Sequence, residues 1–272
     1  MIIVYSILTL GLLGLASGVL LAFAAKKFYV PVDPRVEQLT GILPGANCGA
    51  CGYASCQALA KAVLKGEAAV NSCIAGSVST AEKVAAFMGA KFDNAKNHKR
   101  IAIVRCKGGK DKAKKKFVYT GIKDCSAAQL IAGGHKMCAY GCLGHGNCVK
   151  VCPFDAIDMG ADGIPVVNED RCTACGKCVA ACPRKIIELT SFNQAVYLAC
   201  VSRDKGKKVK DACSVGCIAC GICVKPEVSS QEVITMGGNL PEIHWKEGLD
   251  LKKLLENAVK KCPCNCFSVR GK

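Results

Sequence analysis

The stretch "CTACGKCVAACP", residues 172–183, decides the fold of the region around it. Three cysteines fall within seven residues and Cys182-Pro183 follows, which is the C-x2-C-x2-C-x3-C-P spacing of [4Fe–4S] ligation. In this spacing the first three sulfurs hold one cluster, and the fourth reaches a second cluster nearby. Zinc ribbons use two separated C-x2-C pairs, so the spacing disfavours zinc.

A second run, "CLGHGNCVKVCP" at residues 142–153, has the same outline but carries His145 in the place of a middle cysteine. Its final Cys-Pro predicts that Cys152 crosses to the cluster of the first run. The ligands expected for that cluster are Cys152, Cys172, Cys175 and Cys178.

The partner cluster is left with Cys142, Cys148 and Cys182 and needs a fourth ligand. Two residues are candidates, His145 and Cys138, since imidazole also ligates iron in some clusters. A thiolate suits a low-potential cluster better, so we expect Cys138 to be the ligand and His145 to be a loop residue near the cluster.

A third run, Cys217, Cys220 and Cys223, lacks its own Cys-Pro, but an unattached Cys262-Pro263 lies near the C-terminus. The simplest interpretation is a two-cluster unit that has lost one of its clusters. The ligands expected for the remaining cluster are Cys217, Cys220, Cys223 and Cys262.

Another set of cysteines lies far upstream, within "CGACGYASC" at residues 48–56 and at Cys73. Gly49 and Gly52 allow the backbone to turn tightly, and a separate [4Fe–4S] cluster is expected, with zinc as the alternative. The expected ligands are Cys48, Cys51, Cys56 and Cys73.

Six cysteines remain, and a weak internal repeat relates some of them. The spacing C-x3-C-x5-C occurs from Cys138 and again from Cys213, so that Cys220 of the second copy falls on His145 of the first. A further cluster across the repeat and free buried thiols are both open interpretations. These residues are Cys106, Cys125, Cys200, Cys213, Cys264 and Cys266.

The N-terminus is apolar. Residues 2–25 contain no charged side chain, and Lys26 and Lys27 follow. The length suits a membrane-spanning helix, and the missing basic residue before it disfavours the alternative, a cleaved signal peptide. Because the basic residues follow the span, the rest of the chain is expected on the cytoplasmic side of the inner membrane. That compartment is reducing, which disfavours disulfides for the 22 cysteines.

Lysine-rich loops at residues 110–116 and 205–210 contribute to the formal net charge of +16. Each is either ordinary solvated surface or a docking site for an acidic electron carrier. Nucleic acid is disfavoured because aromatic residues do not interleave with the lysines. The sequence has no dinucleotide fingerprint, phosphate loop or catalytic triad, so no catalytic residue and no cofactor besides the clusters is predicted.

We expect an α+β fold. Its parts are a transmembrane anchor at 1–27, an extended linker at 28–46, a small helical [4Fe–4S] domain at 47–98 and a ferredoxin-like multi-cluster domain at 99–272. Helices are expected at 54–65, 79–89 and 251–259, the second with Ser79 as N-cap, and a strand at 101–106.

The combination of an uncharged N-terminal helix, "CGACGYASC", "CAYGCLGHGNCVKVCPFDAI" and "CTACGKCVAACP" resembles the B subunit of the Rnf complex over nearly the whole chain. The resemblance implies the electron-input subunit of a membrane complex that couples ferredoxin oxidation by NAD to sodium-ion or proton transport. Soluble ferredoxin and the other subunits would be its partners. The alternative is an iron–sulfur subunit of another membrane-associated redox complex.

Overall fold

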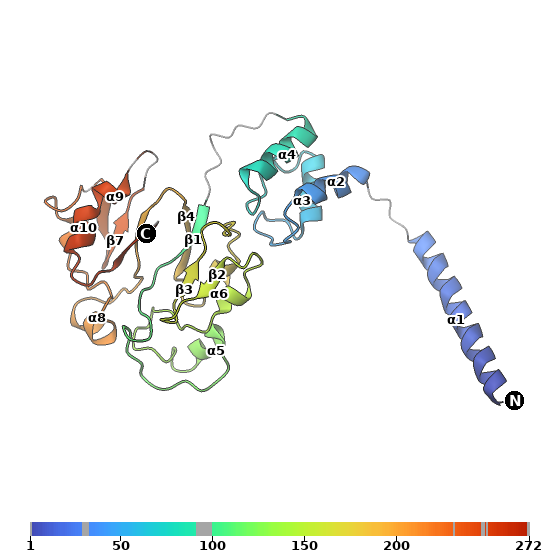
Figure 1. Cartoon of the computed structure of the whole chain (residues 1–272), viewed down its shortest axis with the longest axis horizontal. Helices are drawn as coiled ribbons and strands as arrows, with labels where there is room; N and C mark the ends of the chain where they lie inside the picture. The colour runs from blue at the N-terminus through green and yellow to red at the C-terminus, as the bar shows by residue number, and fades with distance from the viewer. Residues whose placement is uncertain are drawn as a thin grey trace.

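The computed structural model describes residues 2–28, 33–90, 100–230, 232–245, 248 and 250–270. Along the chain they form a long helix, a small helical unit (residues 33–90) and a larger C-terminal part (residues 100–270), as Figure 1 shows. The expected boundary at residue 98 lies within 91–99, outside the described residues.

Helix α1, Ile2–Lys27, projects away from the other parts (Figure 1). At 1.5 Å per residue it is about 39 Å long, which exceeds the hydrocarbon core of a bilayer. Its leucines and other large apolar side chains face outward with no protein against them; Leu12 is 72% exposed. Residues Val4–Lys27 are therefore a candidate membrane span by length and composition.

The helical unit is built from α2 (Pro34–Ile42), α3 (Cys56–Leu64) and α4 (Val78–Met88). The sequence predicts an extended linker where α2 lies, and the structure differs. Asp33 caps α2 by accepting a hydrogen bond from the Arg35 N–H, and Pro34 occupies the first helical turn. The helix buries one face, Val36 and Leu39, against the core of the unit.

The starts of the other two helices follow from their caps. Ser55 Oγ accepts from the Ala58 N–H at 3.1 Å and opens α3 where the sequence predicts a helix. The helix predicted from Ser79 begins one residue earlier, at Val78, with Ser77 as N-cap; the side chain of Ser79 instead hydrogen bonds to Ser77 Oγ.

The first half of the C-terminal part (residues 100–191) pairs its outer strands antiparallel, β1 (Arg100–Val104) with β4 (Ile187–Ser191). Between them lie a hairpin and three short helices. These elements are α5 (Cys125–Leu130), α6 (Asn147–Lys150), β2 (Ile157–Met159), β3 (Pro165–Val167) and α7 (Lys177–Ala180).

The second half (residues 196–269) repeats this order. Strand β5 (Val196–Leu198) pairs antiparallel with β8 (Phe267–Val269), and the elements between them again include a hairpin and short helices. These are α8 (Lys207–Ala212), η2 (Ile222–Val224), β6 (Ile234–Gly237), β7 (Leu240–Ile243), α9 (Leu251–Leu254) and α10 (Glu256–Lys261). The helix predicted at 251–259 is thus divided into α9 and α10.

Each half has its own apolar core, and cysteines are part of both cores. Two basic side chains from the end of β1 connect the halves. Arg105 Nε donates to the Leu198 carbonyl at 3.2 Å, and Lys107 Nζ donates to the carbonyls of Asn265 and Phe267 at 3.0 and 3.1 Å. Lys107 of the first half therefore holds the segment that follows Cys262-Pro263.

Candidate metal centres

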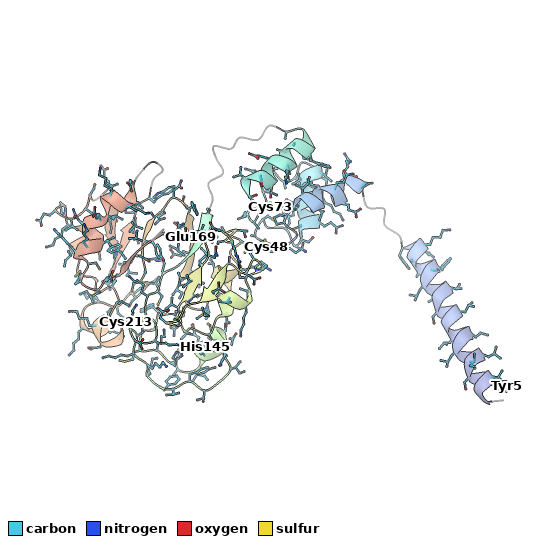
Figure 2. The ribbon with its side chains drawn as sticks, in the orientation of Figure 1. Tyr5, Cys48, Cys73, His145, Glu169 and Cys213 are labelled. Atoms are coloured by element: carbon cyan, nitrogen blue, oxygen red, sulfur yellow. The ribbon has the colours of Figure 1, made fainter. Side chains whose placement is uncertain are left out.

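In the helical unit the four predicted ligands line one solvent-open cavity of about 320 Å³. Asn47 positions part of this set, because its side-chain oxygen accepts from the Cys56 N–H at 2.8 Å. Figure 2 labels Cys48, which lies in the turn before α3, and Cys73, which lies in the segment before α4; both line this cavity. The set, called here set 1, comprises Cys48, Cys51, Cys56 and Cys73.

The three cysteine runs of the C-terminal part share one turn conformation. The third and fifth residues of each run have positive φ, including Ala174 at 56° and Ala219 at 58°. Such values are uncommon for alanine, and the same turn at three places marks a common role for the enclosed sulfurs. The positions are Gly144, Ala174 and Ala219 at the third residue, and Gly146, Gly176 and Gly221 at the fifth.

The Cys-Pro segments also share one turn. The third residue after each cysteine has positive φ: Asp155 at 46°, Lys185 at 51° and Asn265 at 48°. In two of the three segments, the backbone N–H of the following residue donates a hydrogen bond to the sulfur of that cysteine. Ala156 donates to Cys152 and Cys266 donates to Cys262, both at 3.3 Å. N–H···S hydrogen bonds of this kind stabilise a thiolate and tune an iron–sulfur cluster.

Set 3 is the name kept for the group predicted from the two neighbouring runs, Cys152, Cys172, Cys175 and Cys178. The charges of Cys152 and Cys172 are felt at Cys175, whose pKa is raised chiefly by burial. The Ala102 N–H of β1 donates to Cys172 Sγ at 3.4 Å, so β1 supports this set from the side.

Set 2 differs from the sequence prediction in one member. Cys142, Cys148 and Cys182 line a cavity of about 350 Å³, and the fourth cysteine on that cavity is Cys125, not Cys138. Cys125 is the first residue of α5, and its N–H donates to the Asn147 side chain at 2.9 Å. Asn147 in turn donates to Asp124 at 2.6 Å, which ties α5 to the run that contains Cys148.

Sequence spacing did not reveal Cys125, because it lies 17 residues before Cys142 in a segment without a cysteine motif. His145, the other sequence candidate, is turned to a different side. Its ring lies 5.2 Å from that of Tyr119 and 5.4 Å from that of His135, and it does not line the cavity of set 2. Burial lowers the pKa of His145, which favours the neutral ring.

Set 4 lines a cavity of about 370 Å³ in the second half. It comprises Cys217, Cys220, Cys223 and Cys262, the four residues predicted from the third run and the isolated Cys-Pro. Helix α10 leads into Cys262, as α7 leads into Cys182 in the first half. Residues 224–261 therefore connect the run to its Cys-Pro without a second set of three cysteines.

Cys264 and Cys266 also face the set 4 cavity. Hydrogen bonds with Cys217 and Cys262 raise the pKa of Cys266, which is 1% exposed, and the bond from Cys266 lowers the pKa of Cys262 to about 5.

The remaining cysteines are not scattered. Cys106, Cys200 and Cys213 line a cavity of about 500 Å³ together with Cys138, the residue that the sequence assigned to set 2. This group lies between the two halves of the C-terminal part, and Figure 2 shows Cys213 near α8.

Burial makes many of these sulfurs costly to ionise without a metal. It raises the pKa of Cys142, Cys178 and Cys223 to about 12, so as free thiols they stay protonated at neutral pH. Iron ligation replaces the proton and supplies the compensating positive charge.

The arrangement fits a [4Fe–4S] cluster better than zinc. A zinc site draws its sulfurs to about 2.3 Å from one ion. Among the described residues no three cysteine, histidine or carboxylate side chains converge in that way; the sulfurs of sets 1, 2 and 4 surround cavities. Cavities lined by four or more cysteines, with N–H···S hydrogen bonds beside them, suit a cubane.

Comparison with known families gives the same chemistry. The FeS family model, which describes an Fe-S cluster, matches residues 43–75, and the model of a 4Fe-4S dicluster domain matches residues 137–186. These segments contain all of set 1 and most of sets 2 and 3.

Several relatives align over most of the chain. The B subunit of the Na(+)-translocating ferredoxin:NAD(+) oxidoreductase complex of Acetobacterium woodii is 44% identical over 95% of this chain and 75% of that protein. The B subunit of an ion-translocating oxidoreductase complex of Methanosarcina acetivorans is 42% identical over 82% of this chain and 84% of that protein.

A third relative is named for a different ion. The B subunit of the proton-translocating ferredoxin:NAD(+) oxidoreductase complex of Clostridium ljungdahlii is 43% identical over 79% of this chain and 75% of that protein. With such identities over most of the length of both proteins, this chain belongs to the family formed by the B subunits of the ion-translocating (Rnf) oxidoreductase complexes.

Proposed function

We propose that this chain carries electrons from reduced ferredoxin into a membrane-bound, ion-translocating ferredoxin:NAD oxidoreductase complex. The observation that carries the proposal is the grouping of cysteines into sets of four, each around its own cavity or turn, in a chain of this family. The proposed ligands are those of set 1 (Cys48, Cys51, Cys56, Cys73), set 2 (Cys125, Cys142, Cys148, Cys182), set 3 (Cys152, Cys172, Cys175, Cys178) and set 4 (Cys217, Cys220, Cys223, Cys262).

Each bound [4Fe–4S] cluster takes up and releases one electron. The protein contributes the spacing between them. The pKa of Cys178 in set 3 is raised first by burial, then by the charges of Cys172 and Cys175 in the same set, and then by the charge of Cys148 in set 2. The charge of Cys48 in set 1 likewise acts on Cys175 in set 3. Because Cys182 follows the cysteine run of set 3 and lines the set 2 cavity, sets 2 and 3 adjoin, and we propose that set 1 passes electrons to set 3.

The proposed orientation puts α1 across the membrane, with the helical unit and the C-terminal part on the cytoplasmic side. Lys26 and Lys27 close the span, Arg35 follows it, and no lysine or arginine precedes it. The domain division is a helical [4Fe–4S] unit that includes α2, followed by the ferredoxin-like part.

We propose that ferredoxin docks on lysines of the C-terminal part. The lysines at 110, 112, 114, 115 and 116, and those at 205, 207, 208 and 210, are exposed. The relatives from Acetobacterium and Clostridium are named for ferredoxin as a reactant. An acidic carrier would be attracted to this surface, and salt would screen the attraction.

The docking surface predicts a salt-dependent rate. Reduction of the purified chain by ferredoxin should slow by about tenfold or more as ionic strength rises, as for electrostatically steered encounters. Replacing Lys112, Lys114 and Lys116 by Glu should reduce both the rate and its salt dependence, whereas Lys252→Glu and Lys253→Glu on α9 serve as the matched control. A rate that does not respond to salt in any variant contradicts this docking surface.

The iron–sulfur function itself is tested by composition. The full-length chain, purified without oxygen, should contain iron and acid-labile sulfide in equal amounts, at about four of each for every set. Zinc without labile sulfide in a folded preparation would refute the proposal.

A further inference from the structure

Four cysteines outside sets 1 to 4 meet where the two halves of the C-terminal part join. Cys106 and Cys138 come from the first half, Cys200 and Cys213 from the second, and all four line one cavity. Cys200 and Cys213 are 9% and 8% exposed. A cavity lined by cysteines from distant parts of the chain is a built site rather than a chance neighbourhood of thiols.

The internal repeat relates these four residues in pairs. Cys106 follows the end of β1 by two residues, as Cys200 follows the end of β5. Cys138 precedes Cys142 by four residues, as Cys213 precedes Cys217. Each half therefore contributes the same two positions, and the site lies on the approximate symmetry of the repeat.

Both symmetry-related sulfurs receive the same hydrogen bond. The Cys142 N–H donates to Cys106 Sγ at 3.4 Å, and the Cys217 N–H donates to Cys200 Sγ at 3.3 Å. Cys142 belongs to set 2 and Cys217 to set 4. Cys106 Sγ is therefore hydrogen bonded to the backbone of a set 2 ligand, and Cys200 Sγ is hydrogen bonded to the backbone of a set 4 ligand.

The first lysine-rich loop holds two of the cysteines in place. Its Lys114 N–H donates to the Ala212 carbonyl at 2.9 Å, and its Lys112 carbonyl accepts from the Ser214 N–H at 2.9 Å, on either side of Cys213. On its other edge, the Lys114 carbonyl accepts from the Met137 N–H at 2.9 Å, next to Cys138. The loop backbone therefore runs between the Cys138 and Cys213 segments.

A buried cation lies beside the cavity. Lys136 is 5% exposed, its Nζ donates to the Gly108 carbonyl at 2.6 Å, and no carboxylate of the described residues forms an ion pair with it. Gly108 is close to two of the sulfurs, since a Cβ there would be 3.3 Å from Cys213 Sγ and 3.7 Å from Cys106 Sγ. A buried lysine needs a compensating anion, and a cluster with four thiolates carries about −2 in its oxidised state.

We propose that Cys106, Cys138, Cys200 and Cys213 ligate a fifth [4Fe–4S] cluster, which connects set 2 to set 4 across the two halves. When one electron passes from the set 2 cluster to the fifth cluster, the set 2 cluster is oxidised and the fifth cluster is reduced. When that electron passes on to the set 4 cluster, the fifth cluster is oxidised again and the set 4 cluster is reduced. The fifth site adjoins set 2 through Cys142 and set 4 through Cys217.

The test is the iron and sulfide content of the full-length chain purified without oxygen, and it rests on the proposed iron–sulfur function. Cys213→Ser should remove about four iron and four sulfide per chain relative to the native protein. The variant with Cys106, Cys138, Cys200 and Cys213 all replaced by Ser should lose the same amount and no more, because the four thiols serve one cluster. Ser214→Ala, next to Cys213, is the matched control and should keep the native content.

The outcomes separate the two proposals. An iron-free native chain refutes the proposed function. If the native chain contains iron and the quadruple variant contains the same amount, the four cysteines are free thiols. That result refutes the fifth site. A loss of about eight or more iron from the quadruple variant, with the helical and strand content kept by circular dichroism, assigns the thiols to different clusters and also refutes it.

Discussion

At the scale of single residues, Cys125 lines the set 2 cavity, where spacing suggested Cys138, and Cys138 lines the cavity between the two halves. Cys125→Ser and Cys182→Ser should each remove about four iron, and the double variant should remove no more, because both residues belong to set 2. Cys138→Ser combined with Cys182→Ser should remove about eight, because the two residues belong to different sites. Iron analysis of the anaerobic variants measures this, and the reverse pattern would return Cys138 to set 2.

Lys136 makes a second residue-scale prediction. Reduction adds negative charge to a cluster, and a buried cation favours the reduced form. Lys136→Met should therefore lower the midpoint potential of the fifth site. The potential is measured in a redox titration monitored by electron paramagnetic resonance. Lys115→Met removes an equal but exposed charge and should shift it less. A potential that rises in Lys136→Met would show that the lysine does not face the cluster.

The sequence predicts which cysteines belong together only where they lie close to one another along the chain. Cys172, Cys175 and Cys178 lie within one turn, and the spacing alone grouped them. Cys125, at the start of α5, and Cys106, after β1, are placed by tertiary hydrogen bonds, such as that from the Cys125 N–H to Asn147. No periodicity of the chain encodes that contact.

At the scale of elements, α2 is the main departure from expectation. Three prolines between residues 30 and 47 suggested extended chain, but Pro34 begins the helix, at a position where its missing N–H costs nothing. Val36, Leu39 and Leu43 recur at the spacing of one helical face and are buried in the core of the helical unit. The apolar spacing therefore prevailed over the proline count.

Helix α2 should accordingly stabilise the helical unit. Leu39 is 0% exposed, and Leu39→Ala should cost about 2–5 kcal/mol of local stability. Hydrogen exchange of the full chain, read by mass spectrometry, should then be roughly thirty-fold faster or more in peptides from 33–90 and unchanged in those from 100–270. Glu37→Ala, on the exposed face of α2, should leave both regions unchanged. Equal exchange in Leu39→Ala and the native chain would show that α2 adds nothing to the unit.

At the scale of the whole molecule, the C-terminal part consists of two related halves. In each, an outer strand pairs with the strand that follows a Cys-Pro, and a hairpin lies between them. The weak repeat in the sequence anticipated this duplication. It did not show that the join between the halves is itself lined by four cysteines, because that cavity exists only once the two halves pack.

The central claim is that ferredoxin delivers electrons to clusters in this chain. The direct measurement is anaerobic mixing of reduced ferredoxin with the purified full-length protein, with the electrons taken up per chain counted from the loss of its visible iron–sulfur absorbance. The account predicts rapid uptake of up to about five electrons, one for each set of four cysteines. A chain with its full iron and sulfide content that remains oxidised in the presence of excess reduced ferredoxin would contradict it.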